Sequence, residues 1–188
     1  MKSIVHNYLD NIKISLNGFL KHCEKDLLSS ANLIAKKFEK GNKILVCGNG
    51  GSASDAQHFT AELIGRFKKD RIALPAIALN TDTSAITAIA NDYDYKNIFS
   101  RQIEGLGMRG DILLAISTSG NSKNIKDAVK IAKKKNIIVI GLTGSKKSEL
   151  TKSSDLCISV PATETSHIQE LHIIVLHLLC ILIEKKLF

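Results

Sequence analysis

The sequence has little aromatic character: it contains no tryptophan, and only 5% of its residues are Phe, Trp or Tyr. Proteins that bind single-stranded nucleic acid use aromatic rings as stacking platforms, and this chain offers no group of them. Its net charge of +8 is not gathered into a patch, and the run Lys133–Lys135 closes a predicted helix, where cations complement the helix dipole. The composition favours a solvated basic surface over nucleic-acid binding.

Signals of export and membrane insertion are also missing. The first ten residues, MKSIVHNYLD, contain no apolar signal region, and the longest apolar run, Ile173–Ile183, is too short to cross a bilayer and includes His177. No CxxC motif occurs, and each of the four cysteines lies in an apolar stretch: Cys23, Cys47, Cys157 and Cys180. We expect a cytoplasmic protein with reduced core cysteines and no membrane contact.

What is present suits one globular domain spanning residues 1–188, with 44% hydrophobic residues. Within residues 1–40, apolar side chains recur every three or four positions from Val5 to Phe38, which predicts an N-terminal pair of amphipathic helices. Residues 41–188 instead contain short continuous apolar runs, which are typical of strands buried on both faces. These runs lie at 43–47, 76–79, 111–116, 137–141 and 156–160.

Segments with helical character separate the runs, at about 53–66, 82–105 (broken near Asn91) and 122–135. The alternation predicts an α/β fold of three layers, in which helices flank a five-stranded parallel sheet. A final segment at about 165–186 is apolar nearly all round, so we expect this helix to be buried inside an oligomer.

Two predicted loops at the carboxyl ends of strands have the composition of phosphate-binding loops. The first, CGNGGSAS at 47–54, contains three glycines that permit close backbone approach, and the second, ISTSGNS at 116–122, contains four hydroxyls around one glycine. The hydroxyls could instead only cap a helix. A dinucleotide fingerprint fits Gly48–Ala53 formally, but the second strand ends in Leu79-Asn80 rather than an acidic residue, and no GxxxxGK[ST] occurs. We therefore expect no nucleotide cofactor.

Candidate chemical groups lie on two predicted helices. His58, Glu62 and Arg66 share one face of the first at four-residue spacing, although such a set is more often a surface pair than a site. Gln169 and His177, eight residues apart, lie among apolar neighbours on the last helix, where a histidine is usually a satisfied core residue. We expect His172 to be such a core residue or to lie at an interface. Together His58, Glu62, Gln169 and His177 would also make a zinc-type ligand set.

Four motifs in order carry a family resemblance: CGNGGSASDAQHFTAELIGRF, IANDYDYKNIFSRQ, ISTSGNS and HIQELHIIVLH. From about residue 43 to 183 the chain resembles a sugar-isomerase (SIS) domain, and within that family it is similar to the phosphoheptose isomerases. The resemblance implies conversion of sedoheptulose 7-phosphate into D-glycero-D-manno-heptose 7-phosphate, for the heptose of bacterial surface polysaccharides such as lipopolysaccharide or capsule. It also implies cytoplasmic homotetramers whose active sites draw on neighbouring subunits.

Residue roles follow from the same resemblance. It implies Glu62 and His177 as the acid/base pair and one Zn²⁺ per subunit on His58, Glu62, Gln169 and His177. The implied substrate contacts are Asn49, Gly50, Gly51, Ser52, Glu62, Asn91, Asp92, Ser117, Thr118, Ser119, Ser122 and Gln169. His167 stands where many relatives have arginine, which puts one local contact in doubt.

The chemistry agrees with these roles, because moving a carbonyl between C2 and C1 requires a base to take a proton from carbon and an acid to return one through an enediol. We expect Glu62 to act as the base and His177 to serve an oxygen or the second carbon, while a metal could polarise the carbonyl. Two alternatives remain. One is a non-catalytic SIS-domain protein that binds the bacterial replication initiator, although that branch lacks residues equivalent to Glu62 and His177. The other is a different phosphosugar isomerase.

Overall fold

The computed structural model describes all residues, 1–188, and contains one five-stranded parallel sheet. The strands lie in the order β2-β1-β3-β4-β5. Their bounds are β1 Ile44–Cys47, β2 Ala76–Ala78, β3 Ile112–Ile116, β4 Ile138–Thr143 and β5 Leu156–Ser159. The helices are α1 Lys2–Phe38, α2 Gly51–Ile64, α3 Thr83–Asp92, the 3₁₀ turn η1 Tyr95–Asn97, α4 Ser100–Leu106, α5 Lys123–Lys134, α6 Glu149–Ser153 and α7 Thr165–Leu187.

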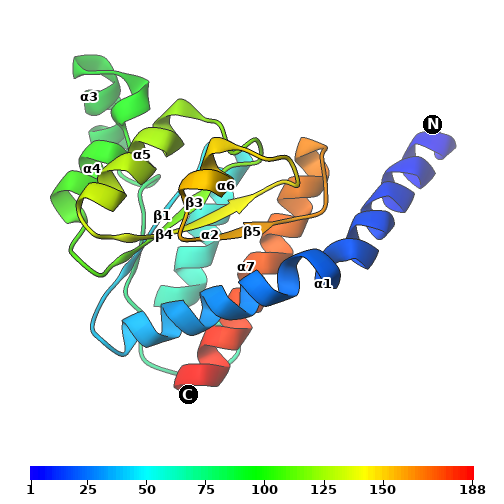
Figure 1. Cartoon of the computed structure of the whole chain (residues 1–188), viewed down its shortest axis with the longest axis horizontal. Coiled ribbons are helices and arrows are strands. Elements are labelled where there is room, and N and C mark those ends of the chain that lie inside the picture. The colour runs from blue at the N-terminus through cyan, green and yellow to red at the C-terminus, as the bar shows by residue number, and fades with distance from the viewer.

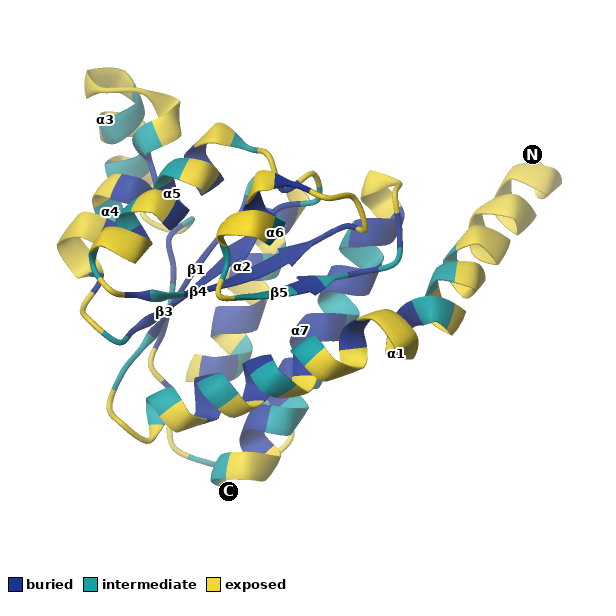
Figure 2. Cartoon of the chain, viewed as in Figure 1, coloured by how far each residue is buried: buried dark blue, intermediate teal, exposed yellow.

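The sheet is the middle of three layers, as predicted (Figure 1). Successive strand residues point to opposite faces, so Ile44 and Val46 of β1 join one core and Leu45 and Cys47 the other. Residues of α1, α2 and α7 complete the first core, and residues of α4, α5 and α6 complete the second. Because β1, β3 and most of β4 are buried on both faces (Figure 2), their sequences are continuous apolar runs.

The N-terminal helical pair is wrong: residues Lys2–Phe38 form one continuous helix, α1. The two apolar stripes are in phase, and no proline interrupts the segment. Its only glycine, Gly18, lies against Pro161, where a β-carbon would sit 3.6 Å from the proline ring. Burial begins only at Phe19. The part of α1 before Phe19, here called its projecting part, is exposed or half-buried, and its N-terminal end extends away from the rest of the chain (Figure 2).

Other predicted boundaries are close. The break near Asn91 is confirmed, since α3 ends at Asp92 and is followed by η1 and α4. Helix α6 was not predicted because its five residues are too few to show a periodicity. Its start is marked by a capping box, in which Ser148 and Thr151 each bond the other's backbone N–H. All four cysteines are free thiols.

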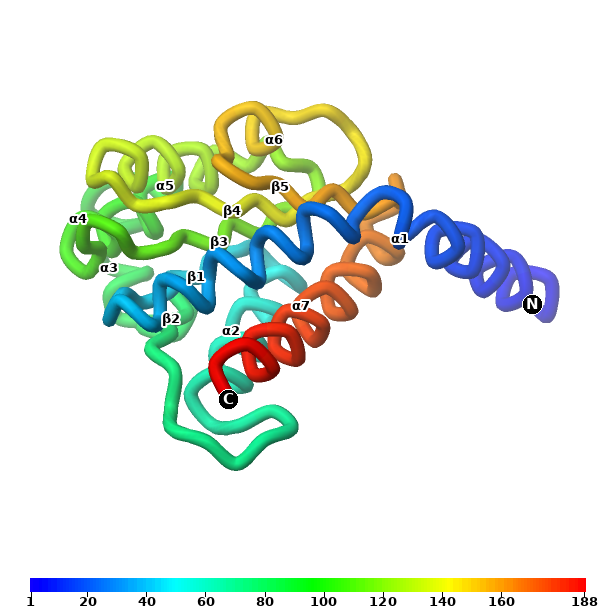
Figure 3. The backbone as a smooth tube through the Cα atoms, turned by 60° about the horizontal axis from the view of Figure 1, so that its bottom comes forward, coloured from blue at the N-terminus to red at the C-terminus, as the bar shows by residue number.

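Helix α7 has the length and composition of a membrane-spanning helix, but half of its most apolar window is buried inside the protein. It packs between α1 and α2 against the sheet, as Figure 3 shows. Its sequence also includes His167, His172 and His177. The burial explains the apolar composition, and we assign α7 as a core helix of the domain.

Candidate functional site

The strand order predicts a ligand-binding site beside β1. Strand β2 lies on one side of β1 and strand β3 on the other, so the chain winds in opposite directions from this point. Open parallel sheets bind ligands beyond the carboxyl ends of the strands at such a switch point. The two loops that follow β1 and β3 are the loops predicted to bind phosphate.

The β1–α2 loop depends on its glycines. Gly50 has φ +55°, a conformation that L side chains rarely adopt, and a β-carbon on Gly48 would collide with the backbone carbonyl of Ser52. Helix α2 begins directly after Gly50 and has no side-chain cap, so its first N–H groups remain available to an anion. Ser52 is buried in the first turn.

Asparagine side chains join the two loops. The Asn49 amide donates to Asn124 Oδ1 at 2.9 Å, and the Asn124 amide donates back to Asn49 Oδ1 at 2.8 Å. The Tyr95 hydroxyl donates to Asn49 Oδ1 at 3.3 Å, and Asn80 Nδ2 donates to the Gly48 carbonyl at 2.7 Å. Asn49 therefore supports the loop structure, and its side chain does not point freely into solvent.

The β3–α5 loop turns at Gly120, which has φ +64°. Ser117 Oγ accepts from the Gly120 N–H at 3.1 Å and lies 3.4 Å from Ser122 Oγ. Ser119 Oγ accepts from the Asn121 N–H at 3.2 Å. Ser122 is the N-cap of α5 but makes no side-chain cap bond, so the hydroxyls stabilise the turn and leave the first N–H groups of α5 uncapped.

A pocket of about 300 Å³ adjoins this loop, lined from the β3–α5 side by Thr118, Ser119 and Asn121. Lys146 and Lys147, from the β4–α6 connection, and Thr165, from the start of α7, lie on the other side. Polar donors from three elements and two lysines thus converge on one concavity, an arrangement that suits an anionic group.

The predicted acid/base residues lie on neighbouring helices. His58 Nε2 of α2 is 2.9 Å from His177 Nε2 of α7, so one imidazole donates to the other. His58 Nε2 is 3.6 Å from Glu62 Oε1 on the next turn of α2. The Phe67 ring stacks on the His177 ring with centroids 5.5 Å apart. A carboxylate and two imidazoles therefore form one cluster, in which His58 Nε2 is close to both Glu62 Oε1 and His177 Nε2.

Gln169 lies apart from this cluster. Its side chain packs on Gly51 at the start of α2, where a β-carbon would come within 2.5 Å of Gln169 Nε2. Eight helical residues correspond to about 12 Å of rise, so Gln169 and His177 contact opposite ends of the same stretch of α2. Gln169 therefore lies beside the β1–α2 loop and is not brought together with the other three predicted zinc ligands. Its role as a substrate contact stays a prediction.

No group of three or more His, Cys, Asp or Glu side chains in the structure is arranged to hold a metal ion. The donor types in the cluster, two imidazole nitrogens and a carboxylate oxygen, are those that zinc prefers.

Asn91 and Asp92 are not brought to the loops within one chain. They lie at the exposed end of α3, a helix with no buried residue, and the Asn91 amide donates only to Asp92.

His167, which stands where relatives have arginine, is buried at the start of α7. Its Nδ1 is 2.9 Å from Glu170 Oε2, and the Tyr8 hydroxyl donates to the other Glu170 oxygen at 2.5 Å. The Tyr8 ring lies tilted over the imidazole. This side chain therefore joins α7 to the projecting part of α1 and does not face the phosphate loops.

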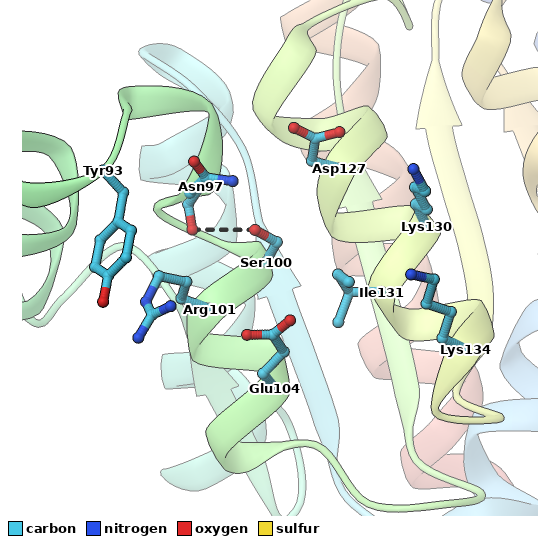
Figure 4. Close-up of a pocket in the computed structure, with 9 residues that line it drawn as sticks. All are labelled: Tyr93, Asn97, Ser100, Arg101, Glu104, Asp127, Lys130, Ile131 and Lys134. Carbon is cyan, nitrogen blue, oxygen red and sulfur yellow. Dashed lines mark hydrogen bonds between the residues drawn. The ribbon is translucent and has the colours of Figure 1, made fainter.

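A second pocket, of about 320 Å³, lies between α4 and α5 (Figure 4). Arg101 and Glu104 line one wall, and Asp127, Lys130 and Lys134 line the other. The charges are mixed, and no residue of the two phosphate loops reaches it. This pocket is separate from the candidate site.

Comparison with known proteins decides the family. A family model described as "SIS domain" matches residues 7–144. A phosphoheptose isomerase from Aneurinibacillus thermoaerophilus is 48% identical over 169 residues, which are 88% of this chain and 85% of the relative. One from Helicobacter pylori is 49% identical over 173 residues, 92% of this chain and 90% of the relative. The chain belongs to the phosphoheptose isomerase family of SIS-domain proteins.

Solved structures of the phosphoheptose isomerase family agree over nearly the whole chain. The enzyme from Neisseria gonorrhoeae is 40% identical with a TM-score of 0.93 and 98% coverage of both chains. The one from Francisella tularensis is 36% identical with a TM-score of 0.94 and 97% coverage of both. The α/β SIS fold and the classification as an isomerase are confirmed, and the replication-initiator-binding alternative is not favoured.

Three residues that the structure places near the candidate site were not identified from the sequence: Asp55, Arg71 and Glu184. Asp55, one turn before His58, is half-buried with one carboxylate oxygen unpartnered, and burial raises the pKa of this carboxyl to about 6. Arg71 and Glu184 form a buried ion pair that joins the end of α2 to the end of α7. The signal for Glu184 was its position seven residues after His177, which puts both on one face of an apolar helix.

Proposed function

We propose that this protein interconverts sedoheptulose 7-phosphate and D-glycero-D-manno-heptose 7-phosphate through an enediol. The observation that carries the proposal is the cluster of Glu62, His58 and His177 on the pair of helices that also borders the phosphate loops. Relatives named phosphoheptose isomerase, at 48–49% identity, support it.

The side chains divide the reaction between them. The Glu62 carboxylate takes a proton from C1 of the ketose, and the electrons form the enediol double bond between C1 and C2 as the C2 oxygen gains a proton. His177 serves the oxygen or carbon on which the second proton exchange occurs. The stacked Phe67 ring restricts the orientation of the His177 imidazole.

The phosphate binds at the loop Ser117–Ser122. Hydroxyls of Thr118 and Ser119 and the uncapped N–H groups of α5 supply hydrogen bonds, and Lys146 and Lys147 supply positive charge from the far wall of the pocket. Gln169 lies between this loop and His177 along α7, a position that suits a contact to the hydroxyls of the sugar chain.

We extend the proposal to one zinc ion per subunit. His58, Glu62 and His177 would hold it, with Gln169 joining only if its side chain leaves Gly51. When bound, zinc would polarise the substrate carbonyl, while a Glu62 that binds the metal would be a weaker base. Elemental analysis of the purified protein tests this extension: one zinc per chain supports it, and full activity of metal-free protein contradicts an obligatory metal.

We also propose a cytoplasmic homotetramer whose sites use neighbouring subunits, and a product destined for surface polysaccharide. Exposed apolar side chains on the projecting part of α1, such as Ile4, Val5 and Leu9, support association. The exposure of Asn91 and Asp92 on α3 is compatible with a contact across a subunit boundary.

Glu62→Gln tests the assigned base. The amide is isosteric but does not take a proton, so we expect a folded protein whose turnover falls by roughly a hundredfold or more. NMR would follow aldose formation from sedoheptulose 7-phosphate, with fructose 6-phosphate as the chain-length control. Full activity of the variant would exclude Glu62 as the base, and conversion of only the hexose phosphate would favour a different phosphosugar isomerase.

A further inference from the structure

The end of α2 and the end of α7 are joined by a buried ion pair outside the residues so far assigned to the reaction. Arg71 Nε donates to Glu184 Oε1 at 3.1 Å, and their side chains are 1% and 3% exposed. A buried pair of this kind is a weak source of net stability, because desolvation offsets the attraction between the charges. We therefore consider the backbone groups that the two side chains bind.

The carboxylate of Glu184 organises the loop that carries Phe67. It accepts hydrogen bonds from the backbone N–H groups of Phe67 at 3.1 Å, Lys68 at 3.0 Å and Lys69 at 3.2 Å. Burial opposes its ionisation, but these three N–H groups and the Arg71 charge outweigh burial and lower the pKa of Glu184. Glu184 thus stays charged and fixes the backbone of the residue whose ring stacks on His177.

The guanidinium of Arg71 holds the other catalytic element. Its Nη2 donates to the backbone carbonyl of Glu62 at 2.9 Å, and its Nη1 donates to the carbonyls of Leu63 at 2.8 Å and Ile72 at 2.9 Å. The carbonyls at the end of a helix have no partner within the helix. Arg71 therefore fixes the last turn of α2, which contains Glu62.

The ion pair is thus linked to both members of the acid/base pair. Arg71 binds the backbone carbonyl of Glu62, and Glu184 binds the backbone of Phe67, whose ring stacks on His177. We propose that Arg71 and Glu184 are positioning residues of the reaction, which set the relative placement of the Glu62 carboxylate and the His177 imidazole. This proposal rests on the proposed function, in which those two side chains exchange protons with the sugar. Both side chains are buried, and we assign neither of them a contact to the substrate.

Glu184→Gln is the principal test, with Asp111→Asn as a matched control. Asp111 is also a buried carboxylate that accepts from backbone N–H groups, of Lys43 at 3.1 Å and Met108 at 2.8 Å, and pairs with a cation, Lys43 Nζ, at 2.6 Å. It directly precedes β3 and so lies at the amino end of that strand, whereas the phosphate loops follow the carboxyl ends of the strands. Both variants lose a buried charge, but only Glu184→Gln disturbs the supports of Glu62 and Phe67.

We expect Glu184→Gln to lower kcat by roughly tenfold to a hundredfold and to change KM by less than about twofold, because misplaced catalytic groups slow the reaction while the phosphate loops are intact. Asp111→Asn should leave kcat per folded molecule unchanged. Arg71→Lys keeps a cation beside Glu184 but loses the planar fork that reaches the Glu62 carbonyl, so it should also lower kcat. Equal kcat values for Glu184→Gln and Asp111→Asn would overturn the proposal.

A readout independent of turnover separates this proposal from the proposed function. In protein with isotope-labelled histidine, the His177 ring resonances should shift in Glu184→Gln and stay in place in Asp111→Asn. If wild-type protein fails to convert sedoheptulose 7-phosphate, the proposed function fails and this spectrum alone decides the positioning role. Unshifted His177 signals in a folded Glu184→Gln protein would then contradict it.

Discussion

At the scale of single residues, histidines on one helix have different surroundings and different roles. His177 reaches His58 on α2, whereas His172, one and a half turns earlier, is fully buried with neither ring nitrogen partnered. His172 was expected to be a satisfied core residue or an interface residue. Its complete burial within one chain agrees with a core position, but the expectation that its ring is satisfied by hydrogen bonds is wrong. An apolar helix sequence contains no information about which of its histidines meets another polar group.

His172 predicts a pH dependence of stability. Burial lowers its pKa to about 4, while an unfolded chain has a histidine pKa near 6.5. Between these pH values the unfolded state binds more protons than the folded state. The contribution of neutral His172 to the free energy of unfolding is therefore present above pH 6.5 and is lost as the pH falls towards 4. Chemical denaturation at pH 7.5 and pH 4.5 should show wild type losing on the order of 2–3 kcal/mol more than His172→Leu. Equal losses in the two proteins would contradict a neutral buried His172.

At the scale of elements, the β1–α2 loop is a segment whose glycines constrain its backbone. Glycine at positions 48, 50 and 51 was expected to allow close approach of a ligand. The structure adds a second reason at two of them: Gly48 is packed against the Ser52 backbone and Gly51 against the Gln169 side chain. These glycines are required by the protein's own packing as well as by any ligand.

Gly48→Ala tests this reading. The added β-carbon meets backbone atoms of Ser52 that cannot move without shifting α2, so we expect a loss of about 2 kcal/mol or more in the free energy of unfolding. Gly105→Ala is the control, since its β-carbon would meet nothing within 4 Å and alanine favours the helix by roughly 0.5–1 kcal/mol. Thermal unfolding of both variants would measure the difference. A neutral Gly48→Ala would show that the turn relaxes freely.

The elements that could be predicted are those whose local pattern has one interpretation. The largely apolar run 111–116 matches strand β3. The serine-rich loop directly follows β3 and leads into α5, as its place in the sequence indicated. The helical pair was wrong because an amphipathic stripe does not show where a helix ends when no proline or cap interrupts it. Contacts such as Arg71–Glu184 join residues 113 positions apart and leave no local pattern.

At the scale of the whole molecule, a single chain leaves apolar surface uncovered. The exposed side chains of α1 before Phe19 include Ile4, Val5, Leu9, Ile14 and Leu16. Helix α7, predicted to be buried in an oligomer, is already half covered by its own chain, so its composition alone does not require a partner. The projecting part of α1 is the stronger indication of assembly.

Removing residues 2–16 tests this part of the account. The deleted segment has no fully buried side chain, so the remainder of the domain should fold, while the proposed tetramer should lose contacts. Sedimentation should find wild-type tetramers and smaller species for the truncated chain. Tetramers of unchanged stability after the truncation would show that this segment does not hold subunits together.

The central claim is that the Glu62 carboxylate and the His177 imidazole carry out the proton transfers of an enediol isomerisation between C1 and C2 of the sugar, and it is tested most directly in deuterium oxide. Sedoheptulose 7-phosphate is incubated with the wild-type protein, and the product is read by NMR. The account predicts the aldose with solvent deuterium at C2, since the proton returned to carbon comes from a side chain that exchanges with solvent. Absence of the aldose, or an aldose entirely without deuterium at C2, would contradict it.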